Sequence, residues 1–139
     1  MKKCVNFAEI KLKKMKKAIA TNNAPGAIGP YSQAIAANGF LFISGQMPVN
    51  PATGNVVDGG ITEQTEQVMK NLEAILKEAG CTFDNVVKST CYLSDIANFG
   101  AMNAVYGKYF KQDPPARAAF AVRTLPKEVM VEIEMIAAL

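Results

Sequence analysis

An arginine stands alone among prolines and small apolar residues in the segment PPARAAF, residues 114–120. A guanidinium in such surroundings needs an anion, and its planar fork matches the two oxygen atoms of a carboxylate. Arg117 is therefore a candidate receptor for a small organic acid. An interface salt bridge with Glu132 or Glu134 is the structural alternative that this segment leaves open.

Two carboxylates are spaced so that they share one face of a predicted strand. Between Val129 and Ala138, apolar residues alternate with Glu132 and Glu134. Side chains at i and i+2 of a strand project from the same side, about 7 Å apart. If a neighbouring subunit covers that face, each carboxylate needs a partner or a raised pKa, and one of them can position a water molecule. A solvated edge strand is the alternative.

The sequence contains no histidine, and this absence narrows the chemistry. It excludes Ser-His-Asp and Cys-His catalysis, imidazole proton shuttles and nearly every catalytic zinc site. The three cysteines, Cys4, Cys81 and Cys91, lie far apart without Cys-x-x-Cys spacing, which favours a reducing cytoplasm over disulfides or a thiolate metal cage. Any catalysis must therefore use carboxylates, hydroxyls, Arg or Lys, and backbone groups.

Three further segments place polar groups at turns or at a helix border. Ser44 and Gly45 close a predicted strand, Tyr31 follows a Gly-Pro turn, and Asn103 adjoins the apolar Met102 of a predicted helix. A hydroxyl followed by glycine commonly presents backbone N–H groups to a ligand, but it also commonly serves only to turn the chain. Each of these signals is weak by itself.

The positive charge is concentrated in the first residues of the chain. Half of the 139 residues are hydrophobic, which indicates one globular domain. Residues 1–17 hold seven lysines and one acid, so the remainder has eight basic and eleven acidic residues. We therefore expect a basic extension over 1–14 and a domain over 15–139. The extension is solvated, or reflects a start-site assignment upstream of Met15, or tethers the protein to RNA or a membrane surface.

The domain itself lacks the features of two common classes of partner. A mildly acidic body has no broad cationic face of the kind that nucleic-acid binding usually needs. The longest apolar runs have five residues, whereas a membrane span needs about 20. We expect a cytoplasmic protein that binds neither nucleic acid nor membrane through its folded domain.

The hydrophobic patterns predict five strands and two helices. Asn38-Gly39 is a strong hairpin signal, and Gly80 is a typical residue at which a helix ends. Asn98 is placed to begin the second helix, and the run Asp113-Pro114-Pro115 ends it. The predicted strands are 32–37, 40–44, 86–93, 116–122 and 129–138, and the predicted helices are 61–79 and 99–110.

This order predicts an α+β fold with two helices on one face of a single sheet. The other sheet face would be open to water in a monomer, yet the strands are apolar, or apolar mixed with small residues, on both sides. Burying that face against other copies of the chain is the economical solution, so we expect an oligomer.

Several motifs, taken together and in order, resemble one family. They are APGAIGPYSQ (24–33), SGQMPVNPATG (44–54), PARAA (115–119) and LPK (125–127) followed by VEIE (131–134). The set is similar to the RidA (YjgF-type) reactive intermediate deaminases, also called endoribonuclease L-PSP or translation inhibitors. The similarity runs from about Met15 to Leu139.

The resemblance implies a chorismate-mutase-like fold and a homotrimer with active sites between subunits. It also implies hydrolysis of 2-iminobutanoate, 2-iminopropanoate and related enamine or imine acids to 2-keto acids and ammonia, without cofactor or metal. Such acids are released by pyridoxal-phosphate enzymes such as threonine dehydratase.

The site residues carried over by the resemblance fall on residues already singled out. The resemblance implies that Arg117 binds the substrate carboxylate and that Glu132 positions water, and we expect Tyr31 and Ser44 to bond or shield the nitrogen. Gly45, Asn103 and Ala119 complete the binding site. Some relatives have cysteine at the position of Ala119, so here only its backbone can act.

Two other functions remain alternatives at this point. One is an endoribonuclease or translation inhibitor, as some family names suggest, although the chain lacks histidine and its body is acidic. The other is a non-enzymatic sensor of small carboxylates, or a holdase, that uses the same cleft.

Overall fold

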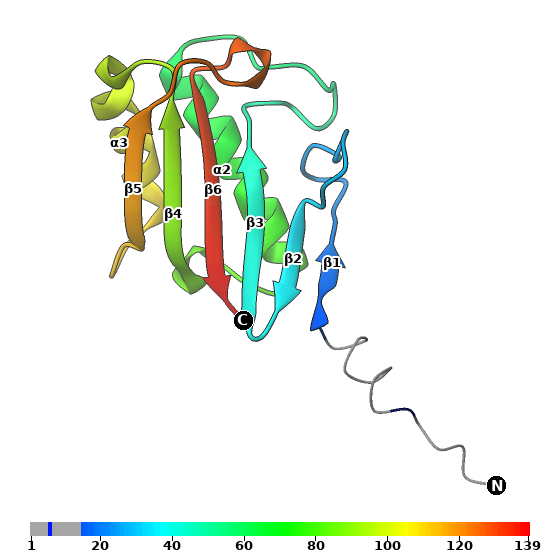
Figure 1. Ribbon diagram of the computed structural model, residues 1–139. Helices are drawn as coiled ribbons and strands as arrows, with labels where there is room; N and C mark the ends of the chain where they lie inside the picture. Colours follow the sequence, from blue (N-terminus) through cyan, green and yellow to red (C-terminus); the bar gives the residue numbers. More distant parts are fainter. Residues whose placement is uncertain (1–5, 7–14) are drawn as a thin grey trace, which may run out of the picture.

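The computed structural model describes Asn6 and residues 15–139, so the rest of the predicted extension lies outside the described residues. The described chain forms one six-stranded sheet in the order β1-β2-β3-β6-β4-β5, with two helices on one face (Figure 1). The strands are β1 (Lys17–Ile19), β2 (Ala34–Ala37), β3 (Phe40–Gln46), β4 (Val86–Leu93), β5 (Ala116–Ala121) and β6 (Val131–Ala138), and the helices are α2 (Ile61–Glu78) and α3 (Phe99–Tyr106). The predicted α+β class with one sheet and two helices is confirmed.

The two strongest local signals in the sequence are confirmed. Asn38 and Gly39 both have positive φ, 50° and 80°, in the tight turn that joins β2 to β3. Gly80 follows α2 with φ 76°, a backbone conformation that residues other than glycine rarely adopt. These turns fix which side of β3 and which stripe of α2 face the core.

Three details differ from the prediction. The sequence patterns do not predict β1, which pairs with β2 at the edge of the sheet. Only three residues take part in this pairing, and a strand of that length is too short to show alternation. The second helix is α-helical only as far as Tyr106 and continues as one 3₁₀ turn, Gly107–Tyr109. Asn98 begins this helix as predicted, but its side chain makes no capping hydrogen bond.

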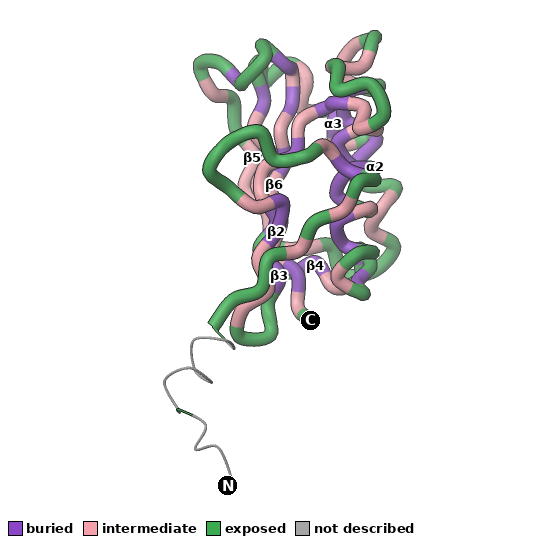
Figure 2. Tube along the Cα trace, turned by 90° about the vertical axis from the view of Figure 1, so that its right-hand side faces the viewer, coloured by how far each residue is buried: buried purple, intermediate pink, exposed green. Residues whose placement is uncertain are grey.

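The sheet has one covered and one open face. Residues between the sheet and the helices are buried, whereas the outer face is half-buried or exposed (Figure 2). On β6, buried Val131, Ile133 and Met135 alternate with half-buried Glu132 and Glu134, as predicted. The open face also carries Phe42 and Phe120, which are 45% and 46% exposed. No helix in the described part of the chain is both long and apolar enough to cross a membrane.

Candidate functional site

Arg117 lies on the helix-covered side of the sheet, near its β5 edge. It stands opposite Ser89 of β4 in the parallel β4–β5 pair, and Ser89 is fully buried beneath α3. The Arg117 Nη1 atom donates a hydrogen bond of 2.7 Å to Oδ1 of Asn103 on α3. Two of the predicted site residues, Arg117 and Asn103, are therefore in contact within one chain.

A cavity of ≈ 320 Å³ and another of ≈ 490 Å³ adjoin predicted site residues, and the larger contains Arg117. Besides Arg117 and Asn103, it is lined by Tyr106, Gly107, Phe110, Pro114 and Pro115. A guanidinium has five N–H donors, of which Asn103 uses one. The remaining donors and the uncompensated charge suit an anion with paired oxygen atoms.

The backbone of Ala119 is directed to the free edge of the sheet. β5 is an edge strand, and the N–H of Val122 donates to the carbonyl of Leu93 in β4 at 2.8 Å. Because successive residues of a strand alternate in the side to which their peptide groups point, the N–H of Ala119 points away from β4. This N–H and Arg117 thus lie along the same edge.

Glu132 lies on the other side of the sheet, beside a bulge in β3. The β3–β6 register shifts between Ile43 and Gln46, so Ser44 and Gly45 form an irregularity in β3. A Cβ on Gly45 would overlap Oε1 of Glu132, at a separation that real Cβ atoms essentially never show. Glycine at position 45 is therefore what makes room for the Glu132 carboxylate.

The Glu132 carboxyl has a perturbed environment. Burial raises its pKa, and the nearby charge of Glu134 raises the pKa further. Glu134 in turn accepts a hydrogen bond of 2.9 Å from the hydroxyl of Tyr92. A carboxylate with a raised pKa is a better proton acceptor than an ordinary exposed one.

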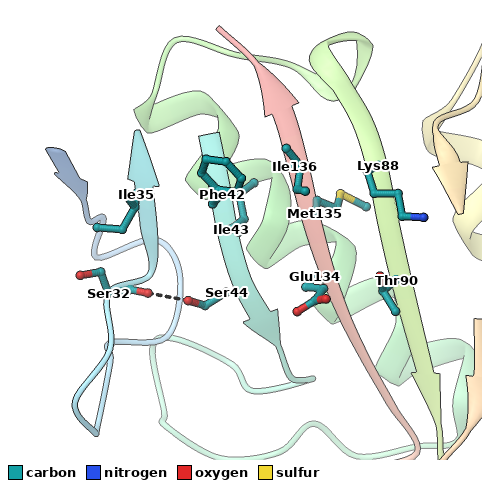
Figure 3. A pocket seen from close by; sticks show the side chains of 10 residues that line it. All are labelled: Ser32, Ile35, Phe42, Ile43, Ser44, Lys88, Thr90, Glu134, Met135 and Ile136. Atoms are coloured by element: carbon teal, nitrogen blue, oxygen red, sulfur yellow. Dashed lines mark hydrogen bonds between the residues drawn. The ribbon is translucent and has the colours of Figure 1, made fainter. Parts of the chain in front are cut away.

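Ser44 organises the loop that carries Tyr31. Its hydroxyl donates to the carbonyl of Ser32 at 2.6 Å, as Figure 3 shows at the rim of the smaller cavity on the open face. The oxygen of Ser44 keeps a lone pair with which it can accept a further hydrogen bond. Tyr31 itself is 49% exposed, so its ring is available to another molecule.

Gln33 holds the segment before Tyr31 in place, a role that its position in the motif APGAIGPYSQ does not reveal. Its side chain is buried, donates to the carbonyls of Thr21 and Pro25, and accepts from the N–H of Thr21. These bonds hold the segment that leads to Tyr31. A glutamine at the start of a strand gives no local sign of contacts eight to twelve residues away.

The predicted site residues thus fall into two groups on opposite faces of one sheet. The first group is Arg117, Asn103 and Ala119, and the second group is Ser44, Gly45 and Glu132, with Tyr31 in the loop that Ser44 bonds. A ligand that touches both Arg117 and Glu132 cannot do so within a single chain, because the sheet lies between them.

The chain is similar to one family over most of its length. The model of the family described as endoribonuclease L-PSP matches residues 21–139. A RutC family protein of Pyrococcus horikoshii is 54% identical over 88% of this chain and 98% of its own. The human 2-iminobutanoate/2-iminopropanoate deaminase is 49% identical over 88% of this chain and 90% of its own.

A solved structure extends the similarity to the fold. Escherichia coli TdcF, solved with bound serine, has a TM-score of 0.84 and 37% identity, and the match covers 88% of this chain and 98% of TdcF. The chain therefore belongs to the endoribonuclease L-PSP family, which is the RidA (YjgF-type) family that its motifs resemble.

Proposed function

We propose that the protein hydrolyses 2-imino acids, with 2-iminobutanoate and 2-iminopropanoate as substrates, to 2-keto acids and ammonia. The observation that carries the proposal is the guanidinium of Arg117, held in an open cavity by the neutral amide of Asn103. The human relative is named as a deaminase of these two substrates. A free guanidinium fork suits the carboxylate that every such substrate carries.

The residues support a short reaction sequence. Arg117 binds the carboxylate and draws electron density away from the adjacent C=N carbon. A water molecule held by Glu132 attacks that carbon and gives up a proton to the carboxylate. Glu132 returns that proton to the nitrogen of the resulting carbinolamine; as the C–N bond breaks and ammonia leaves, the hydroxyl proton passes back to Glu132 and the 2-keto acid forms. The sum is one imino acid and one water consumed, and one keto acid and one ammonia formed.

Ser44 and Tyr31 suit the nitrogen end of the substrate. With its proton donated to Ser32, the Ser44 oxygen is left to accept from an imine N–H. The exposed ring of Tyr31 can shield the reacting carbon from bulk water. A protonated imine is already electrophilic, so this sparse site is sufficient for a modest acceleration.

The complete site forms between copies of the chain in a homotrimer. The two groups lie on opposite sheet faces, so Arg117 of one copy must meet Glu132 of another. The open face, with exposed Phe40, Phe42 and Phe120, supports such assembly because this apolar surface would otherwise stay in water. The substrates are unstable imines, so an enzyme that eliminates water or another group from an amino acid, such as a pyridoxal-phosphate dehydratase, must supply them.

A coupled assay tests the reaction. A threonine dehydratase generates the imine in place, and the rates of imine loss and keto-acid release are followed with and without the protein. We expect faster conversion in proportion to protein concentration. An unchanged imine half-life together with tight keto-acid binding would favour a carboxylate sensor instead.

The family description also names an endoribonuclease. Purified protein, with and without residues 1–14, is to be incubated with RNA alongside Arg117→Ala. Cleavage that survives purification and is lost in the variant would favour the ribonuclease function. We expect no such cleavage, because the body of the chain is acidic and has no histidine.

Gly45→Ala is expected to reduce kcat/KM about a hundredfold, because the new methyl group must displace the Glu132 carboxylate. Gly100→Ala is the matched control, since a Cβ at Gly100 has no atom within 4 Å. Imine hydrolysis by both variants measures the effect. Equal activity of Gly45→Ala and Gly100→Ala would contradict the role of this close approach.

The pH dependence of kcat/KM is expected to shift in Glu134→Gln. Glu132 acts as the ionised carboxylate, so activity falls as the pH drops through its raised pKa. Removing the charge of Glu134 lowers that pKa, and the loss of activity therefore moves to lower pH. Glutamine at position 134 still has an oxygen atom that accepts the hydrogen bond from Tyr92. Glu73→Gln is the control, because it removes one negative charge from α2 instead of from β6. A midpoint that stays in place or rises would show that Glu134 does not act on Glu132.

A further inference from the structure

One stripe of α3 faces the guanidinium of Arg117. Phe99, Asn103 and Tyr106 stand at i, i+4 and i+7 and therefore lie on the same side of the helix. The Arg117 Cζ atom is 4.8 Å from the ring centroid of Tyr106 and 5.4 Å from that of Phe99. Both distances are within the range at which an aromatic face attracts a cation.

The Tyr106 ring is held in place by a hydrogen bond to Ser89 of β4. Its hydroxyl and that of Ser89 are 2.6 Å apart, and both residues are buried. Ser89 is the residue of β4 that stands opposite Arg117. Strand β4, the Tyr106 ring and the Arg117 side chain are thus joined in one closed set of contacts.

The side chains that contact the Arg117 guanidinium are neutral. The Tyr106 hydroxyl stays protonated because burial raises its pKa. Among the described residues, the ion pair within 4.0 Å joins Lys108 to Glu66 and does not involve Arg117. The rings and the amide hold the guanidinium in place while leaving its charge uncompensated for an incoming anion.

We propose that Tyr106, tethered by Ser89 and assisted by Phe99, is a positioning residue that presents Arg117 to the substrate carboxylate. A free arginine side chain has rotamer entropy to lose when it binds a ligand. A guanidinium ordered in advance loses less of it when the ligand arrives. The inference rests on the proposed function only in naming the carboxylate as that of the imino acid.

The test separates the ring of Tyr106 from its hydroxyl. The variants are Tyr106→Leu, Tyr106→Phe, Ser89→Ala and the Tyr106→Phe/Ser89→Ala double variant. The probe is 2-oxobutanoate, an unreactive keto acid, and its Kd is measured by calorimetry beside KM and kcat for the imine. Tyr109→Phe is the matched control, because it removes a hydroxyl bonded to Glu66, away from Arg117.

Tyr106→Leu is expected to raise Kd and KM about tenfold with a smaller change in kcat. Tyr106→Phe keeps the ring and rescues most of the affinity. The Kd of the double variant is expected to equal that of the single variant that binds less tightly, because both single changes break the same hydrogen bond. Tyr109→Phe binds like wild type.

An unchanged Kd in folded, oligomeric Tyr106→Leu would overturn the inference, as would an equal loss in Tyr109→Phe. If Tyr106→Leu does not fold, Phe99→Leu takes its place, because Phe99 is only partly buried. We then expect a severalfold rise in Kd. An unchanged Kd in Phe99→Leu would contradict the inference. If wild type binds 2-oxobutanoate but does not hydrolyse imines, the proposed function fails while the positioning role is still decided by Kd. If wild type hydrolyses imines and Tyr106→Leu is unaffected, only the positioning role fails.

Discussion

Arg117→Ala is expected to abolish the acceleration of imine hydrolysis, with kcat/KM at least about a thousandfold lower. The change removes the guanidinium to which the proposed function assigns the substrate carboxylate, and alanine leaves the cavity without a positive charge. The fold is expected to persist, because Arg117 is only half-buried at an edge strand. The coupled assay, with thermal unfolding and sedimentation as structural checks, measures the result.

Two further arginine variants show whether charge or geometry matters. Arg117→Lys keeps the charge but loses the planar fork, so we expect activity between those of wild type and Arg117→Ala. Arg123→Ala removes an exposed arginine that does not line the cavity and is expected to retain full activity. Full activity in folded Arg117→Ala would refute the carboxylate receptor.

Glu132→Gln is expected to lower kcat about a hundredfold or more while changing KM little. Glutamine fills the same space beside Gly45 but cannot accept the proton of the attacking water. Substrate affinity is expected to be largely preserved, because the proposed receptor of the substrate carboxylate is Arg117, which lies on the other face of the sheet. Steady-state kinetics over a range of imine supply separates the two parameters.

Glu134→Gln is the matched control for Glu132→Gln, since the two glutamates share a strand and a face. It is expected to retain most of its kcat near neutral pH. A similar loss of kcat in both variants would mean that the negative charge of this face matters and that Glu132 has no individual role. A large rise in KM in Glu132→Gln would instead place Glu132 in substrate binding.

The local signals of the sequence were sufficient for most of the fold. The alternation on β6 predicts which side chains face the helices, because the period of a strand is fixed by its backbone. The stripe of Val68, Leu72, Ile75 and Leu76 predicts the buried side of α2 for the same kind of reason. Asn38-Gly39 and Gly80 predict a hairpin and a helix end because few residues adopt positive φ.

The arrangement of the site could not be predicted from local patterns. That Arg117 and Glu132 lie on opposite faces depends on the parallel pairing of β5 with β4, which joins residues 28 positions apart. The role of Gly45 depends on a bulge and on a carboxylate 87 residues away. Such contacts follow from strand register, whereas turns and periodicity report only near neighbours in the chain.

One feature of the aromatic contacts was present in the sequence. Phe99, Asn103 and Tyr106 have helical spacing, so an amide lies between two rings on one stripe of the helix. The apolar pattern predicts the two aromatic residues on one face of the helix and Asn103 near the border of that face. The structure brings all three to Arg117 because α3 packs beside β5.

Mixing two inactive variants tests most directly whether Arg117 of one copy works with Glu132 of another. Arg117→Ala and Glu132→Gln are unfolded together in equal amounts and refolded, and mass spectrometry verifies that mixed oligomers form. In a ring of identical interfaces, random assembly pairs an intact Arg117 with an intact Glu132 at about a quarter of the sites. We therefore expect the mixture to recover about a quarter of the wild-type activity. A mixture of verified mixed oligomers that remains as inactive as its parents would contradict a site shared between copies.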